Sequence, residues 1–245
     1  MITLRRDQDR HHARRRRHDV WLTFYPGQDA DPMASGFRAL EVLTENRVPP
    51  GAGVSPQPRR QAETVTYVHQ GALAQQDSGG HSNLVRAGEF QRRSTSHSVH
   101  HSDRNASSSD WARIFRISLN PATIDFTDDQ EQKRFSTAER RGVLCVVASP
   151  DGRRGSLRVQ QDMIIHSAIL DHGQHLTYEL TTGRCAWLHV VLGEVEVGEV
   201  ILTGGDGAGI TGERAISLTA RADTEILLLD LPEVIPGFIQ SGGVA

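Results

Sequence analysis

The chain has 245 residues, of which 37% are hydrophobic and 23% are charged, and its formal net charge is −3. This balance permits a packed core and excludes a chain that is disordered throughout. The sequence lacks both an apolar run of the roughly 20 residues that a membrane span needs and an N-terminal secretory signal, so we expect a cytoplasmic protein with no membrane contact.

The N-terminal region is strongly basic. Residues 14–17 are four consecutive arginines, and His11, His12 and His18 lie beside them. Such a run could contact nucleic acid, but the acidic balance of the rest of the chain favours a solvated arm. We therefore expect a basic N-terminal arm and no nucleic-acid partner.

Short segments typical of β-strands follow along the chain. The segments 63–68 and 157–161 have period-two alternation, and the segments 187–192 and 225–231 are apolar enough for buried strands. Clusters of Gly, Asp and Ser interrupt the chain between such segments. Many short strands joined by tight turns predict an antiparallel sandwich or barrel.

One segment between the strand-rich halves predicts a helix. Thr127 and Gln130 have the spacing of a capping box, acidic residues occupy the first turn, and residues 131–134 continue the segment. We interpret residues 123–140 as a short helical linker.

The halves on either side share a pattern of strand, glycine, strand, and then glycine followed by an acidic residue. The pattern uses Gly71 with residues 88–89 in the first half, and Gly193 with residues 205–206 in the second. This internal repeat favours a duplicated domain. We expect an N-terminal domain at 1–122 that includes the basic arm, a C-terminal domain at 141–233, and a flexible tail at 234–245.

The two cysteines are too far apart in sequence for a thiolate zinc motif. Cys145 lies in the apolar run 142–148 and is expected in the core. Cys185 follows Arg184, whose positive charge would lower the pKa of the thiol, so Cys185 is a candidate redox-sensing residue.

Residues 53–105 resemble the first cupin of the pirin family. The resemblance is carried by residues 63–68, Gly71, the turn at 77–80, the segment 86–90, and a His-Ser-Asp at 101–103 where pirins carry His-Ser-Glu. It extends over about residues 18–233. It implies an all-β bicupin, with two antiparallel β-barrels of the jelly-roll type, and a monomer.

The resemblance also implies a metal site in the N-terminal barrel. Typical members hold one iron or other divalent transition metal through three histidines and a glutamate, and some are quercetin 2,3-dioxygenases. In this chain the corresponding positions carry Gln57, Arg59, His101 and Asp103. A guanidinium has no free lone pair, and it repels a cation at about 4 Å by several kcal/mol. A Gln-Pro-Arg at 57–59 also resembles the metal-free YhaK-type branch of the family, so we expect a degenerate site without metal.

Three functions stay open at this point. The first is a non-catalytic protein with a binding or stress- and redox-sensing role, in which Arg59 either binds a small anionic or phenolic ligand or pairs with Asp103. The second is a metal-dependent quercetin 2,3-dioxygenase-type oxidoreductase, whose metal site could be rebuilt from His97, His101 and Asp103. The third is a transcription-associated interaction protein. The substitution of Arg59 favours the first.

Overall fold

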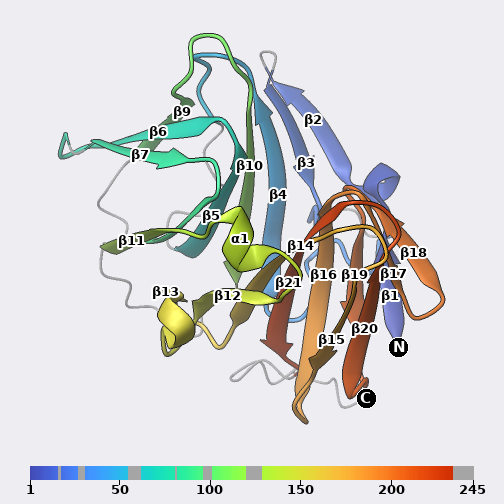
Figure 1. Ribbon diagram of the computed structural model, residues 1–245. Helices are drawn as coiled ribbons and strands as arrows, with labels where there is room; N and C mark the ends of the chain where they lie inside the picture. The colour runs from blue at the N-terminus through green and yellow to red at the C-terminus, as the bar shows by residue number, and fades with distance from the viewer. Residues whose placement is uncertain are drawn as a thin grey trace, which may run out of the picture.

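The computed structural model describes residues 1–15, 18–26, 31–54, 62–80, 82–95, 101–119 and 129–233. They form two stacked units, an N-terminal unit and a C-terminal unit, each with one large and one small β-sheet (Figure 1). The all-β bicupin prediction is confirmed with one refinement. Among the described strands, the two sheets of each unit form a sandwich and are not hydrogen-bonded into a closed barrel. No described helix is long and apolar enough to cross a bilayer.

The large sheet of the N-terminal unit has seven strands in the order β11-β8-β5-β10-β4-β3-β2, and its small sheet has three in the order β7-β6-β9. Neighbouring strands in both sheets pair in antiparallel register. The strands are β2 (His11–Arg15), β3 (His18–Leu22), β4 (Leu40–Val48), β5 (Ala62–Gln70), β6 (Ala72–Asp77), β7 (Ser82–Arg86), β8 (Glu89–Thr95), β9 (His101–Asn105), β10 (Ala112–Leu119) and β11 (Asp129–Arg134).

The large sheet of the C-terminal unit has seven strands in the order β1-β19-β16-β21-β14-β12-β13, and its small sheet has four in the order β15-β20-β17-β18. The pair β12 and β13 is parallel. The strands are β1 (Ile2–Arg5), β12 (Cys145–Ser149), β13 (Leu157–Arg158), β14 (Ile164–Leu170), β15 (His175–Glu179), β16 (Arg184–Leu192), β17 (Glu194–Val197), β18 (Val200–Thr203), β19 (Gly207–Ile210), β20 (Ala215–Ala220) and β21 (Thr224–Pro232). The short helices are η1 (Asp7–Asp9), α1 (Thr137–Arg140) and η2 (Arg153–Gly155).

The N-terminal residues do not form a free arm. Strand β1 pairs with β19 and so belongs to the C-terminal unit, where Ile2 and Leu4 pack against the apolar core. Strands β2 and β3 then form an edge hairpin on the large sheet of the N-terminal unit, with Arg14 opposite Asp19. The prediction that the N-terminal domain begins at residue 1 is therefore wrong for β1, which belongs to the other unit. The predicted solvated arm is wrong for residues 11–15, which form an edge strand. The reason is that alternating apolar residues in β1 gain burial by joining a distant sheet.

The helix predicted around residues 127–134 is wrong for its described part. Residues 129–134 form β11, an edge strand that pairs with β8 in antiparallel register. A helix does lie within the expected linker, but it begins after Ser136. There the Ser136 hydroxyl accepts a hydrogen bond from the Glu139 amide, and the Glu139 carboxylate accepts one from the Ser136 amide. The capping box in this region is thus formed by Ser136 and Glu139, a pair that the sequence analysis did not identify.

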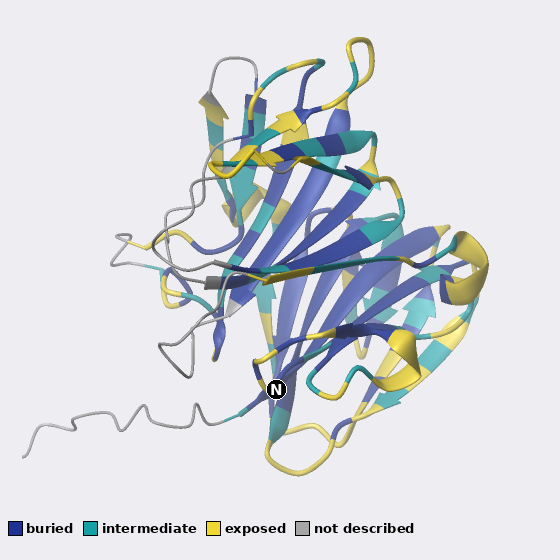
Figure 2. Ribbon diagram, turned by 90° about the vertical axis from the view of Figure 1, so that its left-hand side faces the viewer, coloured by how far each residue is buried: buried dark blue, intermediate teal, exposed yellow. Residues whose placement is uncertain are grey.

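The apolar residues form three separate cores. The first lies between the large sheets of the two units and includes Tyr67 and Phe115 from one unit and Trp187 and Leu229 from the other. The second fills the C-terminal unit, and a smaller third one, around Val68 and Ile114, lies in the N-terminal unit. Figure 2 shows the stacked sheets as buried strands with exposed segments at their ends. The shared core makes the two units one packed body.

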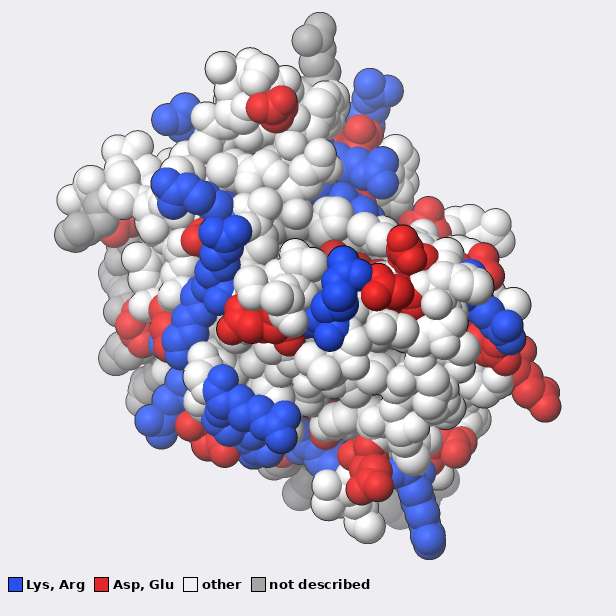
Figure 3. All heavy atoms as spheres, in the orientation of Figure 1, with Lys and Arg blue, Asp and Glu red and all other residues white. Residues whose placement is uncertain are grey.

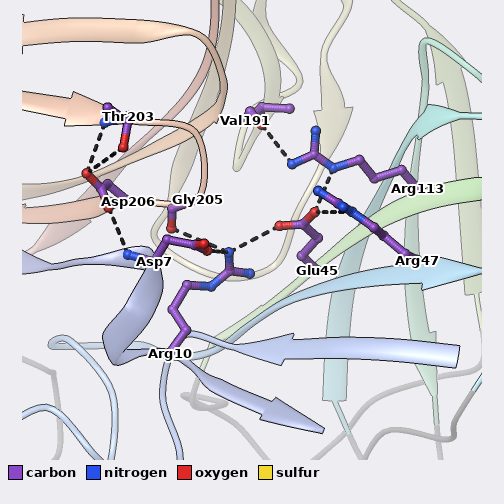
Figure 4. A network of polar contacts seen from close by, with 9 residues as sticks. All are labelled: Asp7, Arg10, Glu45, Arg47, Arg113, Val191, Thr203, Gly205 and Asp206. Carbon is purple, nitrogen blue, oxygen red and sulfur yellow. Dashed lines mark hydrogen bonds and ion pairs between the residues drawn. The ribbon is translucent and has the colours of Figure 1, made fainter. Parts of the chain in front are cut away.

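A polar network also joins the units (Figure 4). The carboxylate of Glu45 on β4 accepts hydrogen bonds from Arg113 Nε at 2.7 Å and from Arg10 Nη1 at 3.1 Å, and Arg47 lies 3.4 Å away. Arg113 also donates to the carbonyl of Val191 at 2.8 Å, across the boundary between the units. We call these four charged residues the Glu45 network. The side chains of Arg10 and Glu45 are only 1% and 3% exposed, so their charges depend on each other.

The predicted repeat is present in both units. Gly71 joins β5 to β6 and Gly193 joins β16 to β17, and both adopt positive φ, at 78° and 84°. A Cβ at Gly193 would lie 2.2 Å from the carbonyl oxygen of Asp223, and one at Gly71 would lie 2.8 Å from that of Trp111. In each unit, therefore, the glycine of this turn lies so close to a neighbouring backbone that no side chain fits at its position.

We expect Gly193→Ala to lower the free energy of unfolding by about 3 kcal/mol, because it combines left-handed backbone strain with a backbone clash. Gly173→Ala is the matched control. Gly173 has a φ of 81°, but a Cβ added there would meet no atom within 4 Å, so strain alone should cost about 1 kcal/mol. Urea unfolding of both variants measures the difference. Equal losses would show that the close approach at Gly193 is unimportant.

Candidate functional site

A polar face lies inside the N-terminal unit. On the adjacent strands β8, β5 and β10, one row of paired residues is Arg93, Thr64 and Ser118, and the next is Gln91, Thr66 and Arg116. These side chains point toward the small sheet, since Gln91 donates to Gln75 on β6 at 2.7 Å and Arg116 donates to Asp103 on β9. The corresponding interior of the C-terminal unit is mainly apolar, with one polar cluster in which Tyr178 donates to Asp230 and contacts the ring of His166. The N-terminal unit differs in having two rows of polar residues across three neighbouring strands.

The alternation of the strands explains this separation. On β5 and β10, the residues between the polar ones, Val65, Tyr67, Phe115 and Ile117, face the core between the units. Thr64, Thr66 and Arg116 lie on the opposite face. A strand that is apolar on one side and polar on the other thus packs the units together and lines the interior of one of them.

Asp103 is the central acidic residue of this interior. Its carboxylate forms ion pairs with Arg116, through Oδ2, and with Arg93, whose Nη1 lies 3.6 Å from Oδ1. The three side chains are 12%, 7% and 14% exposed, in the order Asp103, Arg116 and Arg93. Burial lowers the pKa of Arg116, and the charge of Asp103 opposes that effect. The charged form of Arg116 therefore relies on Asp103.

One oxygen of this carboxylate makes no hydrogen bond, although it faces the guanidinium of Arg93. Among the described residues, Oδ1 of Asp103 is buried and has no hydrogen-bond partner, and Nε of Arg93 is also buried without one. A buried polar atom without a partner is unusual in a native structure and commonly marks a missing ligand, ion or water. The carboxylate of Asp103 therefore has an oxygen available for a further group.

The four sequence-predicted positions are only partly described. Gln57 and Arg59 lie outside the described residues, as does His97 of the alternative site. His101 starts β9, where its backbone pairs with Asp77, and its side chain is outside the described part of the structure. Asp103 lies two residues further along the same strand. The proposed contact between Arg59 and Asp103 stays a prediction.

Sequence reasoning missed Arg93 and Arg116. Arg116 lies in the run Ile114 to Ile117, where a charged residue among apolar ones could have been a signal. Its proximity to Asp103, however, depends on the sheet-to-sheet packing that sequence alone does not show. Within the described residues, no cluster of three or more His, Cys, Asp or Glu side chains has the geometry for a metal. Among the described residues, the fit to a metal therefore rests on Oδ1 of Asp103, which makes no hydrogen bond there.

The redox interpretation of Cys185 rested on a premise that is wrong. The side chain is fully buried in the core between the units, and its Sγ lies 3.6 Å from the carbonyl oxygen of Leu231. Burial raises the pKa of the Cys185 thiol to about 11, and the charge of Arg184 does not compensate. Cys145 is partly buried against the same core, and burial also raises the pKa of its thiol.

We expect the Cys185 thiol of the folded protein to resist oxidation and alkylation at pH 7, because a protonated, buried thiol is a poor nucleophile. Mass spectrometry after treatment with peroxide or iodoacetamide tests this, with Cys185→Ser as the control for assignment of the signal. Cys185 should react only after urea is added. Modification of the native protein at the rate of a free thiol would restore the redox hypothesis.

Two curated relatives match nearly the whole chain. A quercetin 2,3-dioxygenase of Escherichia coli K12 is 36% identical over 234 residues, which are 96% of this chain and 100% of the relative. The pirin-like protein YhaK of the same strain is 30% identical over 222 residues, which are 86% of this chain and 93% of the relative. Among solved structures, the bacterial pirin YhhW from Escherichia coli in complex with nickel(II) has a TM-score of 0.87 and 36% identity, and the match covers 96% of this chain and 100% of that one.

These findings contradict the expectation of a non-catalytic protein with a degenerate, metal-free site. A relative that matches over its full length is named a dioxygenase, and a similar structure at the same identity contains nickel(II). The expectation gave decisive weight to the two residues Gln57 and Arg59. The similarity over the rest of the chain favours the oxidoreductase alternative.

Family models account for most of both units. The model described as Pirin matches residues 5–118, and the model described as the quercetinase C-terminal cupin domain matches residues 146–231. Each match covers most of the strands of one of the two units of the structure. The chain belongs to the pirin family.

Proposed function

We propose that this protein is a metal-dependent quercetin 2,3-dioxygenase-type oxidoreductase whose site lies inside the N-terminal unit. The observation that carries the proposal is the 36% identity, over the full length of the relative, to a protein named quercetin 2,3-dioxygenase. The buried Oδ1 of Asp103 supports it, because this oxygen accepts no hydrogen bond from the described residues and a carboxylate oxygen is a suitable ligand for a divalent transition metal.

In this proposal Asp103 and His101 of β9 hold the metal. Such an ion, when bound, supplies open coordination positions for a phenolic substrate or oxygen. The ion pair with Arg116 fixes one oxygen of the Asp103 carboxylate, so that the other keeps a constant position. Hydroxyl and amide groups on the same interior face, such as Thr66, Gln75 and Gln91, offer hydrogen-bond partners for the hydroxyls of a polyphenol.

The two arginines beside Asp103 should weaken the site without abolishing it. A guanidinium about 4–5 Å from a divalent cation repels it by several kcal/mol at an effective dielectric near 20. We therefore expect Arg93→Gln to bind nickel(II) at least about tenfold more tightly than the original protein. Isothermal titration of the metal into chelator-treated protein measures this, with the exposed Arg214→Gln as the control of equal charge change. Unchanged affinity in Arg93→Gln would place the metal elsewhere.

The function itself is tested by oxygen uptake. Protein purified without chelators, and protein reloaded with nickel(II), iron(II) or manganese(II), is analysed for metal content and then mixed with quercetin in an oxygen electrode. We expect about one metal ion per chain and oxygen consumption that requires quercetin and the metal. Folded, metal-loaded protein that consumes no oxygen with quercetin would refute the proposed activity. Sedimentation of the same sample checks the proposed monomer.

A further inference from the structure

A cavity of about 470 Å³ lies at the seam between the units, away from Asp103. The N-terminal unit contributes strands β8 and β11 to its wall, and the C-terminal unit contributes the segment around β13. The residues that line it are Arg92, Asp129, Pro150, Arg158, Val159 and Gln160. Its volume lies within the ordinary range for sites that bind small molecules.

The wall from the C-terminal unit is held in place by the N-terminal unit. The buried carboxylate of Glu63 accepts hydrogen bonds from the amides of Gln160, at 2.9 Å, and Gln161, at 3.2 Å. Glu131 on β11 accepts one from the amide of Arg158 at 2.8 Å. The backbone around the cavity is therefore fixed before any ligand arrives, which lowers the entropic cost of binding.

The charge of the lining is positive. Two arginines face one carboxylate, and Asp129 is already paired with Arg92, at 2.7 Å from its Nη2. The Arg92 side chain is only 7% exposed, and its buried Nε has no hydrogen-bond partner among the described residues. Arg158 is exposed, and within the described part of the chain its guanidinium has no ion pair. In Figure 3, basic side chains run along the left side of the view, the side on which Figure 1 places β11 and β13.

We propose that this seam cavity binds a small organic carboxylate. The planar fork of a guanidinium matches a carboxylate in two parallel hydrogen bonds, and no acidic side chain of the described residues pairs with Arg158. Pro150, which is partly exposed, offers an apolar surface to the rest of the ligand. An aromatic or short aliphatic acid satisfies both parts of the lining, whereas an inorganic anion uses only the charged part.

This site is separate from the proposed metal site. Arg92 and Arg93 are neighbours on β8, and successive residues of a strand point to opposite faces. Arg93 faces Asp103 inside the N-terminal unit, whereas Arg92 faces the seam, where it pairs with Asp129. The inference is therefore independent of whether the protein oxidises quercetin.

Benzoate is the probe, with benzamide as its uncharged counterpart and inorganic phosphate as the small anion. Each is titrated into metal-free and metal-loaded protein by calorimetry. We expect saturable one-to-one binding of benzoate, equal in both metal states, and binding of benzamide at least about tenfold weaker. Arg158→Gln should weaken benzoate binding at least about tenfold, and Arg214→Gln should not change it.

Three results would overturn the site. They are the absence of saturable benzoate binding, benzoate binding that Arg158→Gln does not affect, and phosphate binding that is tighter than that of benzoate. Arg158 is exposed and only its backbone is held by Glu131, so the variant should keep its fold, which thermal unfolding checks. Because oxygen uptake plays no part in the experiment, benzoate binding can be interpreted even if the proposed dioxygenase activity is absent.

Discussion

Asp103→Asn is expected to lose the metal and to consume oxygen with quercetin at least about 100-fold more slowly than the original protein. The carboxamide keeps the shape of the side chain but removes the negative charge, so that Arg93 and Arg116 face the cation without compensation. Metal content after dialysis and initial rates in the oxygen electrode measure the two effects separately.

Asp103→Glu is the matched variant. It restores the residue that the family pattern carries at this position, and it should retain both the metal and the activity. The pair also separates a loss of function from a loss of structure, because removal of a buried carboxylate beside two arginines destabilises the unit in its own right. Thermal unfolding of both variants measures how far the loss of the carboxylate destabilises the protein. An Asn variant that keeps a full equivalent of metal would show that Asp103 is not a ligand.

Glu45→Gln is expected to lower the free energy of unfolding by about 3–5 kcal/mol, because it leaves Arg113 without its counter-ion and leaves Arg10 with Asp7 alone. The side chains of Arg10 and Arg113 are 1% and 15% exposed, and both pair with this carboxylate. Urea unfolding at pH 7 measures the loss, and Glu179→Gln, at an exposed position on β15, is the control. A loss of less than about 1 kcal/mol would show that the Glu45 network does not hold the units together.

The loss of stability in Glu45→Gln should also depend on pH, which urea unfolding at a series of pH values measures. Burial opposes the ionisation of Glu45, but Arg113 and Arg10 outweigh it and lower the pKa of Glu45 from its ordinary 4.5 to about 2. Because the folded pKa is the lower one, the contribution of Glu45 to stability is complete above about pH 4.5 and is lost as the pH falls toward 2. The stability difference between Glu45→Gln and the original protein should therefore shrink below about pH 4.5.

The strands of this fold could be predicted from the sequence where the pattern of apolar residues and glycines is local. The apolar run at 187–192 is part of β16, the run at 225–231 is part of β21, and the glycines at 71 and 193 mark the same turn in both units. The segment 129–134 was not readable, because it is polar on both faces and becomes a strand only by pairing with β8. Strand β1 likewise depends on a partner some 200 residues away.

The candidate site could be predicted only in part, because it too depends on contacts between residues far apart in the sequence. The resemblance identified Asp103, but Arg93 and Arg116 reach it from two other strands, and their convergence is a consequence of register and sheet packing. The functional error had a different origin. The expectation of an inert site depended on the four positions 57, 59, 101 and 103, whereas the similarity to a dioxygenase and to a nickel(II) complex extends over nearly the whole chain.

Anomalous diffraction from crystals of the nickel(II)-loaded protein tests the central claim most directly, because it locates the metal without reference to activity. We predict one strong anomalous peak at the nickel edge inside the N-terminal unit, in contact with the carboxylate of Asp103. Full nickel loading in solution with no peak at Asp103, or with a peak only on the protein surface, would contradict the account.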